Sequence, residues 1–505
     1  MTISDRQAPV LIGVGEASGQ SLRQGLGIEW PSPVDLASAA AKAALADSGV
    51  ADKLGASIDC LLAIRLFHDS GVQHAYGSPD NFPDAIAQAA DLNPAQLIYG
   101  DVGGQSPQKH INELAVQLHE GKIKAALLCG SESIGTVKRA KKAGHAMDWN
   151  QPSDRDFIDK RTEFPVLTMY EFRHGIISMP MAYGLLENAR RSRLNMDRAS
   201  YATDMAELWS AFSSVASTRE HAQFAKDWSA EELLQDGSGN YQLNDPYRRW
   251  MVAQDAVALG AAVIMTTAGH AEDLGIAEDK MIYLHSGADA SVPIISQQMD
   301  LSRSPAVEWA VGKALDLAEQ QASDIGPIDI YSCFPVAVSL VMEALNQPDR
   351  PLSSYTLTGG LSFFGGPGNS YSTHAIVALV QALRKDGSKP GMISANGGAI
   401  NKESVGIYAA QPLAGGWSPD RIATPNALPP DEGTKPDHFA SGSGVIKSYA
   451  LPYVKGVAGA ATLWLADEND VPCIGLLENP PKDTDLIGER VTISTDGKRN
   501  HAVLQ

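Results

Sequence analysis

The chain has 505 residues, of which 44% are hydrophobic and 20% charged, and its formal net charge is −19 at pH 7. A globular chain of this length predicts two or three folding units. The acidic balance argues against a nucleic-acid partner or an acidic membrane surface, because binding phosphates over a broad face needs a positive field. An anionic small ligand would therefore need a local basic patch.

The cysteines and the N-terminus indicate the compartment. Four cysteines, Cys60, Cys129, Cys333 and Cys473, are widely spaced and form no CxxC pair, which predicts neither a disulfide framework nor a metal site. The first residues lack a charged segment followed by a long apolar one, and no run reaches the ~18 apolar residues that span a bilayer. We therefore expect a cytoplasmic protein that is neither exported nor inserted into a membrane.

The N-terminal part alternates short apolar strands with alanine-rich helices. Residues 10–17 (VLIGVGEA) are typical of a strand ending in a glycine turn, 34–49 (VDLASAAAKAALADSG) of an amphipathic helix, and 58–64 (IDCLLAI) of a buried strand. This order predicts βαβ units in a parallel sheet with helices on both faces.

The middle of the chain interrupts this order. Within a first half of residues 1–265, the stretch from about 131 to 250 begins with the basic run GTVKRAKKAGHAMDW and continues with helical segments, which predicts an inserted helical lid. The strand-like AAVIM at 261–265 resumes the pattern, and a second βα half follows over 266–412. The fold class is therefore α/β.

The C-terminal part has a different composition. Residues 413–440 are dense in Pro, Gly, Ser and Asp, which predicts a mobile linker. Residues 441–505 contain short apolar or alternating segments and no helical pattern, which predicts an independent, small all-β barrel of OB-like type.

An internal repeat relates the two halves. The segment GQSPQKHINELAVQLHEGKIKAALL from Gly104 is similar to GNSYSTHAIVALVQALRKDGSKPGMIS from Gly368. Without gaps, the copies share residue types at Gly104, Ser106, His110, Val116 and Gln117, and at Gly368, Ser370, His374, Val380 and Gln381. The alternative explanation is that any two helix–strand units share the spacing of their apolar residues. Identity at the polar positions favours a duplication instead. Each serine is predicted to cap an amphipathic helix, and the two helix N-termini would then meet at one place.

This duplicated plan, over residues 8 to 412, resembles the thiolase superfamily, and most of all the sterol-carrier-protein branch and the thiolase-like proteins type 1. The lid resemblance lies in 181–208, and IYSCFPVAVSLVMEALN (330–346) stands where that branch carries His-Asp-Cys-Phe. FGGPGNSYSTHAI (364–376) stands at the family's Gly-His-Pro, and SANGGAI (394–400) at its Cys-x-Gly-Gly. The resemblance implies a duplicated, five-layered αβαβα fold with a helical lid, and the β domain fits the type 1 group.

The same resemblance shows that the family's catalytic side chains are missing. Thiolases use a helix-N-terminal cysteine, an imidazole and a second cysteine for covalent acyl transfer. Here Gly104 or Gln105, Gly366 and Ala395 occupy these positions. Ser106 is the nearest hydroxyl and a candidate catalytic residue, but Pro107 behind it favours a capping role.

Several residues remain as candidates for the site. The pairs Gly103–Gly104 and Gly397–Gly398 either direct backbone N–H groups at a thioester oxygen or serve as plain turns. Tyr331 follows a predicted parallel strand and resembles the tyrosine of the lipid-transfer-type aldolases, but the alternative, a tyrosine that packs at a strand end, is the preferred interpretation. The remaining catalytic candidates are Cys333, which is alternatively a small buried hydrophobe, and His374, which is alternatively a satisfied helix histidine.

The resemblance also indicates where coenzyme A would bind. Its phosphates would meet Lys138, Arg139 and Lys142 at the start of the lid, next to the turn Gly365, Gly366 and Pro367. A solvated helix face is the alternative interpretation of this basic cluster.

Three functions stay open. The first is an acyl-CoA enzyme of lipid metabolism without a covalent cysteine, either a carbon–carbon lyase or an atypical acyltransferase. The second is an inactive protein that binds coenzyme A or acyl-CoA, and the third is a scaffold whose barrel recruits a partner. Coenzyme A would be part of the substrate, with no covalently bound cofactor, and the chain would be a homodimer or a monomer.

Overall fold

A computed structural model describes residues 6–70, 76–161, 167–237, 239–425, 428, 438–481 and 484–505. The first half contains five buried strands in the order β3-β2-β4-β7-β1, and a short strand β5 extends the sheet beyond β3. Their bounds are β1 (Pro9–Ser18), β2 (Cys60–Ala63), β3 (Gln96–Tyr99), β4 (Ala125–Glu132), β5 (Ile158–Asp159) and β7 (Leu259–Thr267). Nearly all residues of these longer strands are buried, as expected for strands covered on both faces.

The second half repeats the first. It contains β8 (Ile282–Ser291), β9 (Ile328–Ile330), β10 (Gly391–Gly397) and β11 (Lys402–Ala409). The order β9-β10-β11-β8 matches β2-β4-β7-β1, and corresponding neighbours pair in the same sense, one parallel pair and two antiparallel pairs. A short pairing of Val10 with Tyr283 and Leu11 with Ile282 joins the halves. The predicted duplication is confirmed.

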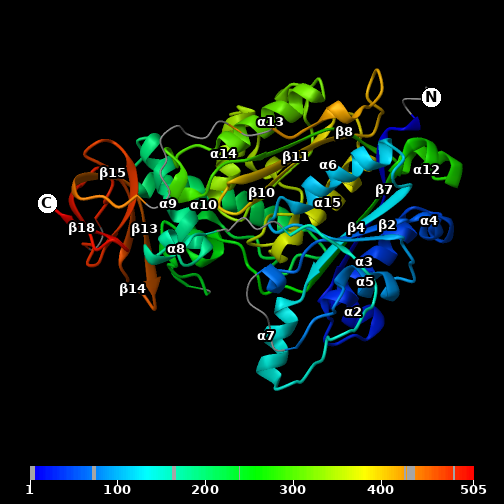
Figure 1. The fold of residues 1–505 in the computed structure, drawn as a ribbon, viewed down its shortest axis with the longest axis horizontal. Helices are drawn as coiled ribbons and strands as arrows, with labels where there is room; N and C mark the ends of the chain where they lie inside the picture. The colour runs from blue at the N-terminus through cyan, green and yellow to red at the C-terminus, as the bar shows by residue number, and fades with distance from the viewer. Residues whose placement is uncertain are drawn as a thin grey trace.

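Three helical layers and the two half-sheets make the five-layered αβαβα fold that the resemblance implied (Figure 1). The outer helices of the first half are α3 (Pro33–Asp47) and α5 (Phe82–Ala89), and those of the second are α13 (Pro305–Leu317) and α14 (Pro335–Leu345). The repeated helices α6 (Ser106–His119) and α15 (Tyr371–Lys385) lie between the half-sheets, where α15 packs on β7 and α6 on β11. Gly13 and Gly15 let α3 approach β1 closely, because a side chain at either would collide with a carbonyl of α3.

The predicted capping serines differ from the structure. Helix α6 begins at Ser106 itself, with Gln105 as its N-cap, and the Ser106 hydroxyl has no hydrogen-bond partner among the described residues. Ser370 does precede α15, but its side chain makes no capping hydrogen bond. Pro107 supplies the expected fixed φ in the first turn, so proline rather than serine marks this helix start.

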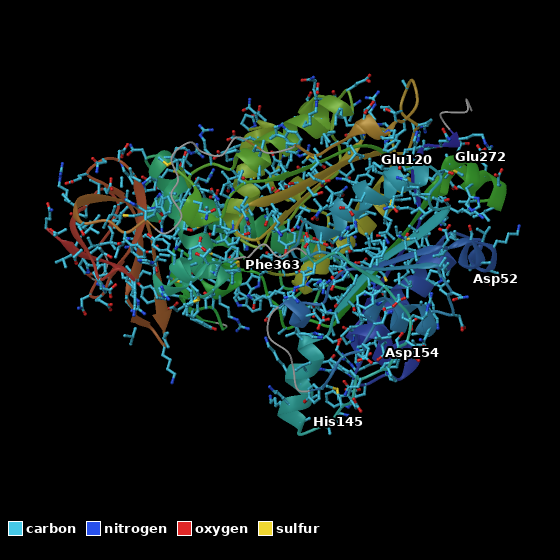
Figure 2. The ribbon with its side chains drawn as sticks, in the orientation of Figure 1. Asp52, Glu120, His145, Asp154, Glu272 and Phe363 are labelled. Atoms are coloured by element: carbon cyan, nitrogen blue, oxygen red, sulfur yellow. The ribbon has the colours of Figure 1, made fainter. Side chains whose placement is uncertain are left out.

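The inserted region is mostly helical. Its helices are α7 (Ile134–Ala143), α8 (Met169–Arg173), α9 (Met179–Arg193), α10 (Arg198–Ala216) and α11 (Ala230–Leu234), followed by the short strand β6 (Asn244–Asp245). Shorter helices elsewhere are α2 (Gly19–Leu26), α4 (Ala51–Ser57) and α12 (Ala268–Leu274). Helix α7 projects from the body, as Figure 2 shows by His145, which lies at the outer end of this arm, while Phe363 lies in the interior.

The C-terminal residues form a closed five-stranded barrel, as predicted. The order β13-β15-β16-β18-β17 closes through a further pairing of β17 with β13, and the barrel has its own core. Its strands are β13 (Gly442–Val454), β15 (Ala461–Asp467), β16 (Pro472–Leu477), β17 (Arg490–Thr495) and β18 (Asn500–Leu504), and β14 (Val457–Ala458) extends β13.

The expectation that the barrel is independent is wrong. Helix α9 packs along β13, and Ala450, Trp464 and Ile474 of the barrel belong to the main hydrophobic core. The Ser448 hydroxyl donates to the carbonyl of Leu185 at 2.6 Å, which fixes the barrel on the lid. The barrel packs against the lid because an independent barrel would expose these apolar side chains to water.

The segment predicted to be a linker is only partly described. Residues 419–423 form a 3₁₀ turn and the strand β12 (Ile422–Ala423), which pairs with β8. Residues 426, 427 and 429–437 lie outside the described residues. Within the described parts of the chain, no helix combines the length and apolar character needed to cross a membrane.

Candidate functional site

Tyr331 stands over the N-terminus of α6. It follows β9, and its N–H donates to the carbonyl of Ser394 at 2.8 Å, which continues the parallel pairing with β10. A Cβ atom placed on Gly104 would lie 2.5 Å from the Tyr331 hydroxyl oxygen. The phenol therefore occupies the space of a side chain at position 104, which with position 105 is one of the two places where the resemblance puts the thiolase cysteine.

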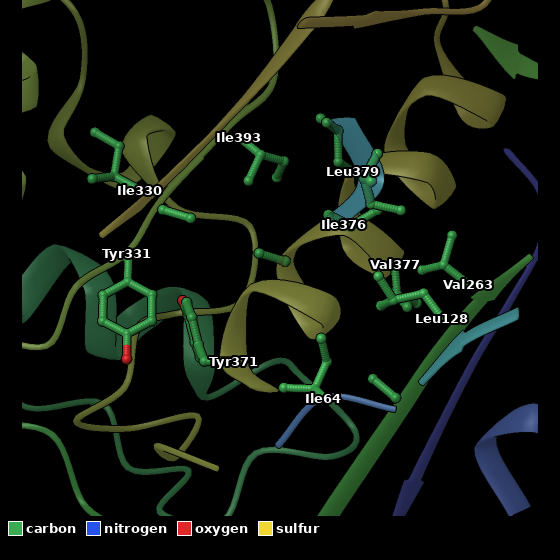
Figure 3. Close-up of a cluster of buried hydrophobic side chains, with 14 of the residues drawn as sticks. Ile64, Leu128, Val263, Ile330, Tyr331, Tyr371, Ile376, Val377, Leu379 and Ile393 are labelled. Carbon is green, nitrogen blue, oxygen red and sulfur yellow. The ribbon is translucent and has the colours of Figure 1, made fainter. Parts of the chain in front are cut away.

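The surroundings of Tyr331 keep its hydroxyl protonated. Its residue exposure is 9%, and burial, together with the nearby Cys333, raises the pKa of the phenol far above its ordinary value. No described residue makes a hydrogen bond to its oxygen, and Figure 3 shows the hydroxyl pointing away from the apolar cluster around Ile330 and Ile376. Such a phenol is suited to donating a hydrogen bond rather than to acting as a base.

Tyr371, in the first turn of α15, holds the ring of Tyr331 in place. The two rings meet edge to face with centroids 5.4 Å apart. The Tyr371 hydroxyl donates to Asp329 Oδ1 at 3.1 Å, and Asp329 Oδ2 accepts the N–H groups of Leu357 and Thr358 at 2.7 and 3.0 Å. This network fixes Tyr371 and thereby the rotamer of Tyr331.

Cys333 lies in a neighbouring buried cluster. Its thiol donates to the Tyr183 hydroxyl at 3.3 Å, and that hydroxyl lies 3.1 Å from Asn396 Oδ1 and 3.0 Å from the carbonyl of Gly398. Burial raises the pKa of the Cys333 thiol to about 12. A thiol with this pKa is not a nucleophile at neutral pH, which favours its interpretation as a small buried residue.

The glycine pairs accommodate Gln105. A side chain at Gly103 or at Gly397 would collide with Gln105 Oε1, so the amide of Gln105 fills the space between the two pairs. The Gly103 N–H already donates to Asn369 Oδ1 at 2.9 Å. The Gly103 amide thus makes its hydrogen bond within the protein, which favours the interpretation of this pair as a plain turn.

The sequence carried no indication of this role of Gln105, since a glutamine at a helix start has many uses. Gly104 and Gly398 also belong to this site, and Gly398 has a left-handed φ of 62° at the turn after β10. A Cβ atom at Gly398 would collide with Asn401 Oδ1, so this glycine is required sterically as well.

Ser106 and His374 are directed elsewhere. Ser106 is fully buried within α6, and the described residues place no base on its hydroxyl. His374 Nδ1 lies 2.6 Å from Glu16 Oε1, and its ring packs against Phe364. His374 therefore ties α15 to β1 and is separate from the Tyr331 hydroxyl; its counterpart His110 similarly pairs with Glu113 at 3.0 Å.

The residues predicted to bind coenzyme A lie in two neighbouring places, the turn of Gly365, Gly366 and Pro367 and the helix α7. The Gly366 N–H donates to the carbonyl of Gln254 at 2.8 Å, and Gly365 has a φ of 118° beside Val257. Next to Gln254, Asp255 binds Lys138 at 2.8 Å, so α7 is connected to the turn.

The basic residues of α7 are partly paired. Besides the Lys138–Asp255 bridge, Arg139 lies 3.5 Å from Glu29 and over the ring of Trp30. Lys142 is exposed in the last turn of α7. A phosphate would have to compete with exposed acidic partners, whose bridges are weak. The described residues contain no group of three or more His, Cys, Asp or Glu side chains arranged to hold a metal ion.

The fold and this site define a protein of the thiolase-like class. The crystal structure of a monomeric SCP2-thiolase-like protein type 1 from Mycobacterium smegmatis is 32% identical, with all of both chains covered and a TM-score of 0.82. The chain belongs to this SCP2-thiolase-like type 1 family.

Two further structures share the fold. An Ltp2–ChsH2(DUF35) aldolase is 15% identical over 81% of this chain and all of that chain, with a TM-score of 0.57. An acetyl-CoA acetyltransferase from Syntrophomonas wolfei is 15% identical over 80% of this chain and 99% of that chain, with a TM-score of 0.54. The chain matches no family model and no curated protein.

Proposed function

We propose that this chain binds an acyl-CoA thioester without becoming acylated and makes or breaks a carbon–carbon bond beside the thioester. The observation that carries this proposal is the phenol of Tyr331 over Gly104, which with Gln105 stands where a covalent mechanism of this family would need a thiolate. A neutral phenol there would donate a hydrogen bond to the thioester oxygen and stabilise an enolate as the bond breaks. The same fold includes one protein named as an aldolase and one named as an acetyltransferase.

A second candidate is a non-catalytic protein that binds acyl-CoA. The side chain of Gln105 covers Gly397, and the amide of Gly103 is engaged by Asn369. These contacts fill part of the space in which thioester oxygen binding was expected. They favour binding without turnover if Gln105 stays in place when the ligand is bound.

Binding and acylation are tested first. Coenzyme A at millimolar concentration is expected to raise the melting temperature, because a ligand that binds only the native state stabilises it. Intact-mass spectrometry after incubation with acetyl-CoA or acetoacetyl-CoA is expected to show no added acyl group. An acetyl adduct on Ser106, Cys129 or Cys333 would contradict the non-covalent proposal, and absence of any thermal shift would contradict both candidates.

Turnover separates the two candidates. Cleavage of 3-hydroxyacyl- and 3-oxoacyl-CoA is followed for the wild type and for Tyr331→Phe, which removes only the hydroxyl. Tyr331→Phe is expected to lower kcat by about 100- to 1,000-fold if the phenol is the hydrogen-bond donor that stabilises the enolate. Unchanged turnover would exclude Tyr331 from this role. Binding of coenzyme A without cleavage of any thioester would leave the non-catalytic candidate.

A further inference from the structure

Glu132, the last residue of β4, is a buried carboxyl group without a cationic partner. It is 2% exposed, and its Oε1 accepts the N–H of Phe67 at 2.5 Å. Among the described residues this is the one hydrogen bond of the carboxyl group, and no described lysine, arginine or histidine forms an ion pair with it. A buried carboxyl group in this state needs a further explanation, because buried polar groups are normally paired.

Glu132 lines a mostly apolar cavity. This cavity of about 110 Å³ is lined by Glu132 together with Pro33, Phe67, His68, Ser133, Ile134, Val137 and Trp149. Burial lowers the pKa of the His68 imidazole. A second cavity of about 370 Å³ shares Pro33, His68 and Trp149 with the first, so the two adjoin. Phe67 is 53% exposed at this place, which is unusual for a phenylalanine and fits a surface that a ligand covers.

The charge state of Glu132 follows from its surroundings. Burial is the main cause, the hydrogen bond from the Phe67 N–H lowers the pKa and the negative charges of Asp69 and Asp255 raise it, and together they bring the pKa of Glu132 to about 8. The acid is therefore mostly neutral at pH 7. Since Oε1 accepts the Phe67 N–H, the other oxygen carries the proton and can donate a hydrogen bond.

Glu132 is linked to the Tyr331 site through Gly368 and Asn369. A Cβ atom on Gly368 would lie 2.6 Å from Glu132 Oε1, so this glycine packs directly on the carboxyl group. The next residue, Asn369, accepts the N–H of Gly103, which precedes the glycine beneath Tyr331. A ligand that reaches Glu132 would therefore end close to the N-terminus of α6.

We propose that this cavity binds the aliphatic part of an uncharged carbonyl compound, and that Glu132 donates a hydrogen bond to the carbonyl oxygen. An anionic ligand is disfavoured by Asp69 and Asp255. The proposal rests on the proposed function only for the identity of the physiological ligand, which would be the acyl part of a thioester. Binding itself is independent of coenzyme A and is tested with small probes.

Three probes of matched shape distinguish a carbonyl ligand from an apolar and a cationic one. They are 2-heptanone, its carbonyl-free analogue 2-methyl-1-heptene, and the cation 2-aminoheptane. Affinities are measured by ligand-observed NMR at pH 6.5 and pH 9.5. The ketone is expected to bind about tenfold more tightly than the alkene at pH 6.5. This difference in affinity corresponds to the free energy of about one net hydrogen bond. That preference is expected to disappear at pH 9.5, because the ionised carboxylate no longer donates.

Two substitutions of Glu132 test its role. Glu132→Gln keeps a donor and an acceptor, so the ketone preference is expected to persist at both pH values. Glu132→Leu is expected to bind ketone and alkene equally, and Val137→Trp, which fills the cavity, is expected to bind neither. Equal binding of ketone and alkene by the wild type at pH 6.5, no binding of either, or tightest binding of the amine would each overturn the proposal.

Failure of this proposal is distinguishable from failure of the proposed function. Tyr331→Phe is expected to leave ketone binding unchanged while it lowers thioester turnover. A wild type that binds coenzyme A and cleaves a thioester, but shows no ketone preference, would remove the role of Glu132 alone.

Discussion

Tyr331 and Gly104 share one small volume: the phenol ring fills the space that any side chain at position 104 would need, with a Cβ there only 2.5 Å from the hydroxyl oxygen. The two positions are therefore coupled. A side chain at position 104 can therefore be accommodated only if the Tyr331 ring moves.

Gly104→Ala is expected to destabilise the protein by about 1 to 3 kcal/mol through overpacking against the ring. In a Tyr331→Ala background the same change is expected to cost much less, giving a coupling free energy above roughly 0.5 kcal/mol. Urea unfolding of the wild type, both single variants and the double variant measures this cycle. Additive free energies would mean that the ring moves away at no cost.

The buried pair of Glu16 and His374 is expected to stabilise the junction of β1 and α15. Burial alone would raise the pKa of Glu16, but the hydrogen bond and charge of His374, with His221 and Arg219, lower it overall. A depressed carboxyl pKa contributes stability above the ordinary pKa near 4.5, and this contribution is lost as the pH falls through the folded-state pKa.

His374→Leu is expected to cost about 3 to 5 kcal/mol at pH 7, because it leaves Glu16 buried without its main partner. The acid-dependent loss of stability is expected to weaken in the same variant. Chemical denaturation between pH 3 and pH 7 checks both. The comparison is Glu113→Gln on the counterpart pair of His110, for which a smaller cost is expected because the Glu113 side chain is 31% exposed.

Ionisation of Glu403 is expected to give the free energy of unfolding the opposite dependence on pH. Its Oε1 accepts the Ser394 hydroxyl at 2.6 Å, its Oε2 has no partner among the described residues, and burial raises its pKa from 4.5 to about 8. A raised carboxyl pKa favours folding at low pH, and this advantage is lost as the pH rises from about 4.5 to about 8.

The free energy of unfolding of Glu403→Gln, relative to the wild type, is therefore expected to increase by roughly 3 to 5 kcal/mol between pH 4.5 and pH 8 and then to level off. Exposed Glu120→Gln serves as the control and should show no such trend. A difference that is constant across this range would mean that Glu403 is ionised in the folded protein.

The bidentate pair of Arg191 and Asp485 joins the lid to the barrel. Both N···O distances are 2.7 Å, and the Arg191 side chain is 4% exposed while that of Asp485 is 39% exposed. Asp485→Asn is expected to lower stability by about 1 to 3 kcal/mol, less than for a fully buried pair.

Loss of this pair should also loosen the docking of the barrel. Limited proteolysis of Asp485→Asn is expected to release a C-terminal fragment faster than in the wild type. The exposed pair of Arg6 and Glu272 supplies a control, since Glu272→Gln should change neither stability nor the digestion pattern measurably. Equal release in all three proteins would show that apolar contacts alone hold the barrel.

The sequence by itself determined the plan of the fold. Strand and helix periodicity are local properties, and the repeat of Gly104 and Gly368 placed two similar helix–strand units in the two halves. The five-layered fold and the C-terminal barrel are both confirmed. The expectation that the family's catalytic side chains are absent at Gly104 or Gln105, Gly366 and Ala395 also came from the sequence, because motif spacing needs no coordinates.

Only the tertiary structure decided what fills the site. The contacts of Tyr331 with Gly104, of Gln105 with Gly397 and of Glu132 with Gly368 join segments that lie far apart along the chain. Such contacts depend on how two half-sheets and two central helices pack, and side-chain periodicity says nothing about which polar group meets which glycine. The charge states of Glu132 and Glu403 were hidden for the same reason, since burial and the absence of a cation are properties of the packed interior.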